Sequence, residues 1–510
     1  MKNILFVVAL FLFCGCSNFL KEYSQDLVVA KNVSDLDEIL LGSTYLPSAQ
    51  YTDINVTGDY CPWLNFLDDD VNTVIGSGSA RTFDPSYNLY GYTTWQLEVG
   101  RTIDGRNLLP DDFTWNNLYN RINVANIILD EADDIDVNTA DDRLGVERIK
   151  GECYFLRAQF YLTLVNLYAD AYSPEKAETT MGVPVKLTSY VEHDKDKELQ
   201  FERASVAEVY RQIVRDLTAA IDLLTRSPQT RPLHRASKEA AQLLLSRVYL
   251  YMQDWENAKK IAGDLLEMNA RLEDMSVTDQ VFLGEKSTEL VFSQGNLSVH
   301  TTVTGERGLL CATRELYDLY DEKDYRASRW FSREYWSDSL ALTGKYQTGA
   351  HRSHVSDCFL LRNAEAYLNM AEACAMSGDA DANRWLNELR RNRIEDYQDQ
   401  TYAGEELIRQ VRNERRKELC FEGHRWFDLR RYAVCKQSPY QKEIRRVFAH
   451  YNYEIRNIFD YAEIFVLEKN DPAYTFRIPA SVLERDKGMP NNPREARVAV
   501  EVLRDIVEQE

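Results

Sequence analysis

The sequence is poor in basic charge and lacks most of the short motifs that mark catalytic sites. Its 510 residues carry 60 Lys and Arg against 81 Asp and Glu, which gives a formal net charge of -21. Because a phosphate backbone is bound by cationic surfaces, this charge argues against nucleic acid as a partner. Glycine-rich phosphate-binding loops, H-E-x-x-H and G-x-S-x-G are all absent. The sequence therefore predicts no cofactor and none of these enzyme classes.

Long hydrophobic runs are also lacking, except for one at the N-terminus. Lys2 precedes an apolar run from Ile4 to Phe13, which is too short to span roughly 30 Å of hydrocarbon and is typical of a signal peptide. Gly15 stands directly before Cys16, as in a bacterial lipobox. We therefore expect residues 1–15 to be a signal peptide, and Cys16 to carry a diacylglycerol anchor as the first residue of the mature protein.

Cysteine pairs with the spacing of redox or zinc motifs are missing as well. Beyond Cys14 and Cys16 the chain has seven cysteines, an odd number, and no two of them form C-x-x-C. We expect free buried thiols, with at most one disulfide that the spacing does not identify. The seven are Cys61, Cys153, Cys311, Cys358, Cys374, Cys420 and Cys435.

Helical periodicity dominates what is present. Apolar residues recur at helical spacing in residues 113–130 and 146–168, and Ser205 with Glu208 forms a capping box before another helix. A shorter helix is expected over residues 33–41, with Ser34 as its N-cap. About half of the chain is predicted to be helical, mainly within residues 113–270 and 359–432, with few short strands such as residues 289–293.

Two helix pairs have the character of tetratricopeptide hairpins. Small residues at Ser246 and Ala258 would let two helices approach closely, and Asp254 can cap the second helix of that pair. Gly378 suits a left-handed C-cap between the helices of the other pair. The predicted fold is thus mainly α, a tetratricopeptide-like helical-repeat scaffold. The four predicted helices are 236–252, 255–268, 360–376 and 380–393.

Two loop-rich tracts, residues 47–110 and 271–358, contain aromatic side chains that could bind a ligand. Residues 433–474 are also predicted to be irregular. Long loops in a compact protein are more often functional than idle. Trp95 is the leading candidate because it lies among tyrosines and Gln96. The alternative is that a loop tryptophan is a buried plug that holds its loop in place. The candidate binding residues are Trp63, Tyr90, Tyr92, Trp95, Trp330 and Trp336.

Acidic and histidine clusters suggest no metal site. Asp68 to Asp70 begin like a calcium loop, but Thr73 stands where glycine is required and Ser79 where glutamate is required. We expect a solvated acidic turn there. His351 and His354 are one helical turn apart without a third ligand nearby in the sequence, and are expected to be an exposed pair.

Glu and Arg alternate among apolar positions in a C-terminal segment from Glu414 to Asp428, which we call the charged block. At helical spacing this pattern indicates partly buried ion pairs that hold helices together. Arg415, Arg416 and Glu418 are the expected members, in a structural rather than a catalytic role.

Several segments, in this order, resemble the SusD/RagB family of Bacteroidota outer-membrane lipoproteins. They are A-E-A-Y-L-N-M-A-E-A at 364–373, E-R-R-K-E-L-C-F-E-G-H-R-W-F-D-L at 414–429, and I-P with N-N-P at 478–479 and 491–493, all after a lipobox. The resemblance spans most of the chain and is weakest in the loop-rich tracts 47–110 and 271–358. It implies one SusD-like domain over residues 16–510.

The resemblance also implies a function. Members are non-catalytic proteins that are lipid-anchored at the outer membrane, face the cell exterior, and pass glycans to a TonB-dependent SusC-like transporter. Stacking of sugar rings on aromatic side chains suits such a role. A peptide-binding member of the family, a secreted lipoprotein glycosidase and a purely structural scaffold are the alternatives.

Overall fold

The computed structural model describes residues 30–47, 60–73, 85–100, 105, 113–190, 196–277, 281–295, 310–333, 340–346, 355–356, 358–452 and 458–504. About 48% of the chain is helical, and the strands are few and short. Both findings confirm the predicted fold class. No helix in these ranges is long and apolar enough to cross a membrane.

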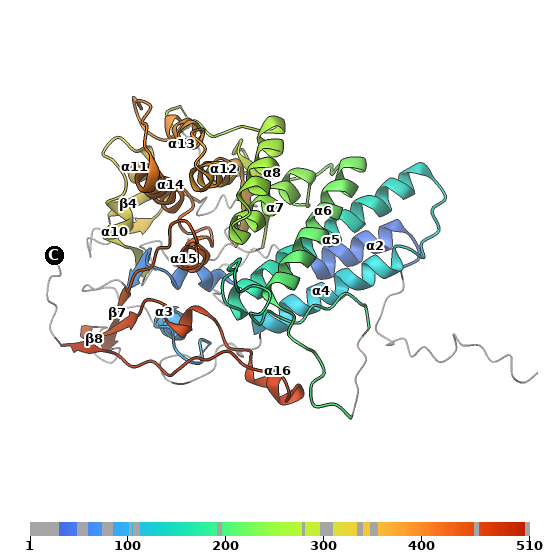
Figure 1. Ribbon diagram of the computed structural model, residues 1–510, viewed down its shortest axis with the longest axis horizontal. Coiled ribbons are helices and arrows are strands. Elements are labelled where there is room, and N and C mark those ends of the chain that lie inside the picture. Colours follow the sequence, from blue (N-terminus) through green and yellow to red (C-terminus); the bar gives the residue numbers. More distant parts are fainter. Residues whose placement is uncertain are drawn as a thin grey trace, which may run out of the picture.

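One end of the molecule is a layer of helices that follow one another in the chain (Figure 1). Its two longest helices, α5 and α6, pack against each other, and α2 and α4 lie against α5. The layer then continues through α7 and α8 to α12. The bounds are α2 Val33–Ile39, α4 Phe113–Glu131, α5 Ala140–Tyr168, α6 Val206–Arg226, α7 Lys238–Met252, α8 Trp255–Met268 and α12 Asn363–Ser377.

Side-chain caps set most of these helix starts where the sequence predicts them. Ser205 and Glu208 form the expected capping box of α6, and Asp254 caps α8. The helix α5 begins six residues earlier than predicted, because Thr139 caps it through a second capping box with Asp142. The prediction that Ser34 is the N-cap of α2 was wrong. The N-cap is Asn32, whose side chain accepts hydrogen bonds from the backbone amides of Ser34 and Asp35.

The two predicted helix hairpins are present and pack against each other. The pair α7 and α8 lies beside α12, which pairs with α13 (Ala382–Arg391). Ser246 is completely buried, and its hydroxyl accepts a hydrogen bond from the Asn369 amide at 2.9 Å. Gly378 adopts the left-handed conformation (φ 72°) that ends α12. The small residue at position 246 therefore allows the close approach of the two hairpins.

The charged block joins two helices in the C-terminal part of the chain. It covers the end of α14 (Gly404–Glu418) and the start of α15 (Arg425–Ala433). The Glu418 carboxylate is fully buried and pairs with Arg326 at 2.6 Å, Arg362 at 2.6 Å and Arg393 at 2.9 Å. Arg415 pairs with Asp428 at 2.9 Å. The predicted ion pairs are thus confirmed, and they are more deeply buried than expected.

The strands of the described residues form three small sheets. They form a four-stranded sheet in the order β1-β3-β5-β4, a pair β2-β6, and a three-stranded antiparallel sheet β7-β8-β9. The predicted strand at 289–293 is confirmed as β2. The bounds are β1 Val71–Thr73, β2 Leu290–Gln294, β3 Leu310–Ala312, β4 Phe331–Arg333, β5 Leu340–Leu342, β6 Phe359–Arg362, β7 Ile444–Asn452, β8 Ile458–Leu467 and β9 Glu501–Leu503.

The prediction that residues 433–474 are irregular was wrong. They contain β7 and β8, the two longest strands among the described residues. Most of β7 is buried on both faces, and its buried Arg446 binds the backbone carbonyls of Val71 and Asp68. A strand buried on both faces lacks the alternation of apolar and polar residues that identifies a half-exposed strand.

Candidate functional site

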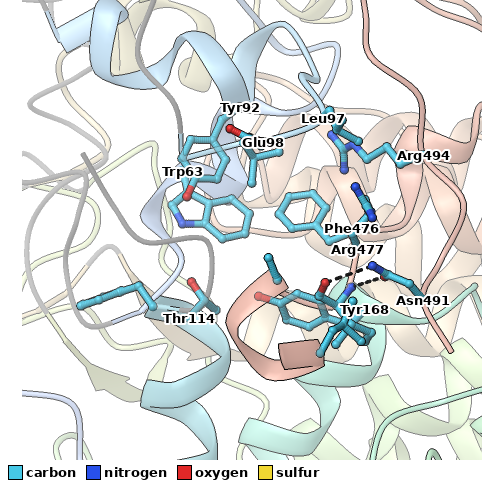
Figure 2. A pocket seen from close by; sticks show the side chains of 15 residues that line it. Trp63, Tyr92, Leu97, Glu98, Thr114, Tyr168, Phe476, Arg477, Asn491 and Arg494 are labelled. Carbon is cyan, nitrogen blue, oxygen red and sulfur yellow. Dashed lines mark hydrogen bonds between the residues drawn. The ribbon is translucent and has the colours of Figure 1, made fainter. Parts of the chain in front are cut away.

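A cavity of about 120 Å³ lies where the first loop-rich tract meets the C-terminal segment (Figure 2). Five aromatic rings border it, together with polar and charged groups from distant parts of the sequence. The aromatic residues are Trp63, Tyr92, Phe113, Tyr168 and Phe476, and the polar and charged ones include Glu98, Thr114, Arg477, Asn491 and Arg494.

Trp63 brings two of these aromatic side chains together. It lies in a short 3-10 helix, η2 (Pro62–Phe66), that Pro62 begins. Its ring stacks with that of Tyr92 at 4.5 Å between centroids and with that of Phe476 at 5.2 Å. All three residues are shielded from bulk water yet border the cavity. Stacked rings of this kind offer a face for the C–H surface of a sugar.

The acidic residues that follow η2 fasten it to the charged block. The Asp69 carboxylate pairs with Arg425 at 2.7 Å, with Lys442 at 2.8 Å and with Arg416 at 3.1 Å, and Asp70 pairs with Arg416 at 2.6 Å. Burial opposes ionisation of Asp69, but Arg425 and Arg416 outweigh it and lower its pKa well below the usual range.

The expectation of a solvated acidic turn was therefore wrong, because Asp68, Asp69 and Asp70 are all buried. Their carboxylate oxygens are close enough to hold a metal ion. Arginine and lysine already neutralise Asp69 and Asp70, however. This arrangement gives the turn a structural role.

Trp95 is completely buried, and its indole N–H donates to the Leu67 carbonyl at 2.8 Å. Its backbone has a φ of 54°, which lets the chain reverse after α3 (Pro85–Thr93). The returning chain passes so close to α3 that a Cβ at Gly91 would overlap the Val99 carbonyl. These contacts favour the alternative of a buried plug for Trp95, and they place the neighbouring Tyr92 and Glu98 at the cavity.

The C-terminal wall of the cavity is tied to the end of α5 by backbone hydrogen bonds. The Phe476 amide donates to the Leu167 carbonyl at 2.8 Å. Asn492 donates from its side chain to the carbonyls of Tyr168 and Phe476, both at 2.6 Å. Asn491 accepts from the Ile478 amide at 2.7 Å. The N-N-P segment thus positions one wall of the cavity.

Two of the other predicted aromatics, Tyr90 and Trp330, do not border the cavity. Tyr90 is half-buried and packs edge-on against Phe448 of β7. Burial, and to a smaller extent the negative charge of Glu463, raises the pKa of the Tyr90 phenol to about 12. Trp330 is completely buried, with the Lys345 ammonium 4.4 Å from its ring. Of the six predicted binding residues, Trp63 and Tyr92 therefore meet at the cavity. Trp336, Cys16, His351 and His354 lie outside the described residues.

The C-terminal half of the site was not predicted. Phe476, Asn491 and Arg494 border the cavity, as does Tyr168 at the end of α5. Their one signal in the sequence was the I-P and N-N-P pair, which carried the resemblance but gave no indication of a ligand site.

Two family models match the chain. Residues 93–250 match a family described as "Starch-binding associating with outer membrane", and residues 322–494 match the SusD family. The chain belongs to the SusD/RagB family. SusD-like protein P2 of Formosa agariphila is 24% identical over 440 residues, which cover 74% of this chain and 79% of that protein.

Solved SusD-like structures share the fold over nearly the whole chain. A SusD-like carbohydrate-binding protein of Bacteroides vulgatus superposes with a TM-score of 0.67 at 21% identity, covering 90% of this chain and 98% of that one. A laminarin-binding SusD-like protein superposes with a TM-score of 0.60 at 18% identity, covering 91% and 100%. At these identities the likeness establishes the SusD fold.

Proposed function

We propose that this SusD-family chain is a cell-surface lipoprotein that binds a glycan and passes it, without chemical change, to a TonB-dependent SusC-like transporter in the outer membrane. The observation that carries the proposal is the stack of Trp63, Tyr92 and Phe476 beside the cavity. Aromatic faces next to hydrogen-bonding groups suit sugar rings, which present C–H faces and hydroxyls. The match to a family described as starch-binding supports the same ligand class.

The lining of the cavity favours binding over hydrolysis. Most glycosidases use two carboxyl groups that face each other across the scissile bond. Among the described residues that border the cavity, Glu98 supplies the one carboxyl group. A secreted glycosidase would require a second one at this site.

Native gel electrophoresis through a panel of embedded glycans tests the proposal. We expect one or more glycans to retard the protein, with no released oligosaccharide after long incubation. Released product would make the protein a glycosidase. Retention by peptides in the absence of any glycan binding would make it a peptide-binding member of the family.

Two tryptophans of the first loop-rich tract form a matched pair for locating the site. Trp63→Ala removes a ring that borders the cavity and should weaken glycan binding by about 1–3 kcal/mol, by analogy with aromatic stacking on bases. Both rings are buried, so either variant should cost about 3–5 kcal/mol of stability, but Trp95→Ala removes a plug away from the cavity and should leave affinity unchanged. Calorimetric titration below the melting range, together with thermal melting, separates the two effects. Weaker binding by Trp95→Ala than by Trp63→Ala would place the ligand elsewhere.

Anchoring is tested independently of ligand binding. Cys16→Ala should abolish labelling by a palmitate analogue in cells, because the lipid is attached through the Cys16 sulfur. Label that persists on the variant would disprove anchoring at this position.

A further inference from the structure

A buried guanidinium, that of Arg494, borders the cavity. Arg494 is 8% exposed, and none of its three nitrogens has a hydrogen-bond acceptor among the described residues. Buried charged groups are normally paired, because leaving a charge unpaired in a low-dielectric interior is costly. A buried guanidinium that borders a cavity and has no acceptor among the described residues can be satisfied by a molecule that enters the cavity.

The charges around Arg494 do not neutralise it. Arg497 already pairs with Asp471 at 2.6 Å, and Arg477 is exposed at the cavity. Burial, followed by the repulsion of Arg497, lowers the pKa of Arg494 to about 9, against weaker attraction from Asp471. The guanidinium is still charged at neutral pH. Glu98, the carboxylate at the cavity, is exposed to solvent.

The unpaired guanidinium and the aromatic stack share the cavity. The guanidinium carbon of Arg494 lies 5.1 Å from the centroid of the Phe476 ring, which stacks with Trp63. Figure 2 shows the Phe476 ring between Trp63 and Tyr92 on one side and Arg494 on the other. At about 120 Å³ the cavity is smaller than the several hundred Å³ that enclose a drug-sized ligand. It suits one substituted sugar residue rather than a whole oligosaccharide.

We infer that Arg494 receives an anionic substituent, a carboxylate or a sulfate ester, of a sugar that lies against the Trp63–Phe476 stack. The ligand of the proposed function is then an acidic glycan, and this inference rests on that function. A guanidinium offers paired N–H donors that match the oxygens of both anions. The net charge of -21 repels acidic polymers at long range, so recognition depends on this local group.

Thermal melting provides a test that needs no knowledge of the glycan. Arg494→Met should melt a few degrees higher than wild type, because it removes an unpaired buried charge. Galacturonate or sulfate, compared with chloride at equal ionic strength, should raise the melting temperature of wild type more than that of Arg494→Met. Arg485→Met, which changes an exposed arginine of α16 (Ala480–Arg485) that does not border the cavity, is the matched control and should behave as wild type.

Matched glycans test the inference directly. Wild type is titrated with oligogalacturonate and its methyl ester, and with a sulfated galactan oligosaccharide and its desulfated form. We expect one charged member to bind about ten- to a hundred-fold more tightly than its neutral counterpart, the range for hydrogen bonds to a charged group. Arg494→Met should remove that preference. Arg494→Lys, which keeps the charge but loses the planar fork, should retain part of it. A preference within the galacturonate pair would identify the anion as a carboxylate, and a preference within the galactan pair would identify it as a sulfate ester.

The outcomes separate this inference from the proposed function. Binding of neutral glycans with no preference for charge, or a preference that survives in Arg494→Met, would overturn the inference alone. A lower melting temperature of Arg494→Met without any specific anion effect would do the same, because Arg494 would then be structural. A specific anion effect without retention of any glycan would overturn both.

Discussion

Arginine is buried in two contrasting settings in this molecule, the charged block and the cavity. At the block, the guanidinium of Arg362, from β6, binds Glu418 at 2.6 Å and Glu422 at 2.7 Å as well as Glu289 at 2.8 Å. In the cavity, Arg494 binds no acceptor among the described residues. The first arrangement is complete without a ligand, whereas the second is not.

A third arginine shows that partners need not be carboxylates. Arg446 of β7 is fully buried and binds the backbone carbonyls of Val71 and Asp68. Burial lowers its pKa to about 10, against attraction from Asp68. The scaffold therefore supplies acceptors to a buried guanidinium even where no ion pair is formed. Arg494 differs from Arg446 in lacking even these, which is why we assign it to a ligand.

The largest effect that the comparison predicts is at the centre of the charged block. Glu418→Gln removes the negative charge that faces Arg326, Arg362 and Arg393, and leaves three buried guanidinium groups with less compensation. We expect a loss of about 3–5 kcal/mol in the free energy of unfolding, measured by urea denaturation.

The matched control is Glu501→Gln, which breaks an exposed pair with Arg445. That variant should lose less than about 1 kcal/mol. Equal small losses in Glu418→Gln and Glu501→Gln would mean that burial of the block does not strengthen its ion pairs.

A somewhat smaller effect is expected at the edge of the block. Arg416→Ala removes the pairs with Asp69, Asp70 and the half-exposed Glu315, while Arg425 continues to pair with Asp69. The loss should lie near the lower end of about 3–5 kcal/mol, with ligand affinity unchanged when measured well below the melting range. If Arg416→Ala abolished ligand binding without changing the melting temperature, Arg416 would be a binding residue and not a structural one.

Acid should weaken the ion pairs of the charged block. Burial opposes ionisation of Asp69 and Glu418, but their arginine partners lower both pKa values well below the usual range. Their contribution is present in full above the unfolded pKa of about 4 and is lost as pH falls through the lower folded values. Asp68 acts in the opposite direction, because burial and Asp70 raise its pKa.

Because the lowered pKa values belong to the more numerous ion pairs, the melting temperature should fall as pH drops below about 4. The decline should be smaller in Glu418→Gln, which lacks one of the titrating groups. An equally steep decline in that variant would assign the acid sensitivity to other carboxylates.

The smallest effect is expected at the rim of the cavity. Arg477→Met changes an exposed side chain and should alter stability by no more than about 0.5 kcal/mol. Its effect on affinity for an acidic glycan should stay below about 1 kcal/mol, the range for exposed charge pairs. A larger effect than that of Arg494→Met would transfer the anion contact from the buried arginine to the exposed one.

The helical scaffold was predictable because its signals are local. Ser205 and Asp254 cap the helices that the sequence assigned to them, and Gly378 ends α12 in the left-handed conformation. The ion pairs of the charged block were predictable for the same reason, since Glu and Arg recur there at helical spacing. Their partners, such as Arg362, were not assigned.

The cavity depends on contacts between residues far apart in the sequence. Trp63 meets Phe476 more than four hundred positions later, and Asp69 reaches Arg425. No periodicity within one segment encodes such a contact. The same limit explains why Asp68 to Asp70 were expected to be solvated: their sequence shows three acids, but not the cations that the fold places around them.

None of the seven described cysteines beyond Cys16 forms a disulfide, and five of them are buried. Burial raises the pKa of the Cys61 and Cys374 thiols to about 12, so their reactive thiolate forms are scarce at neutral pH. The chain can therefore reach its final structure without an oxidase or a disulfide isomerase. Its thiols also form a built-in set of reporters, because an alkylating reagent can modify the buried ones only when the surrounding helices open.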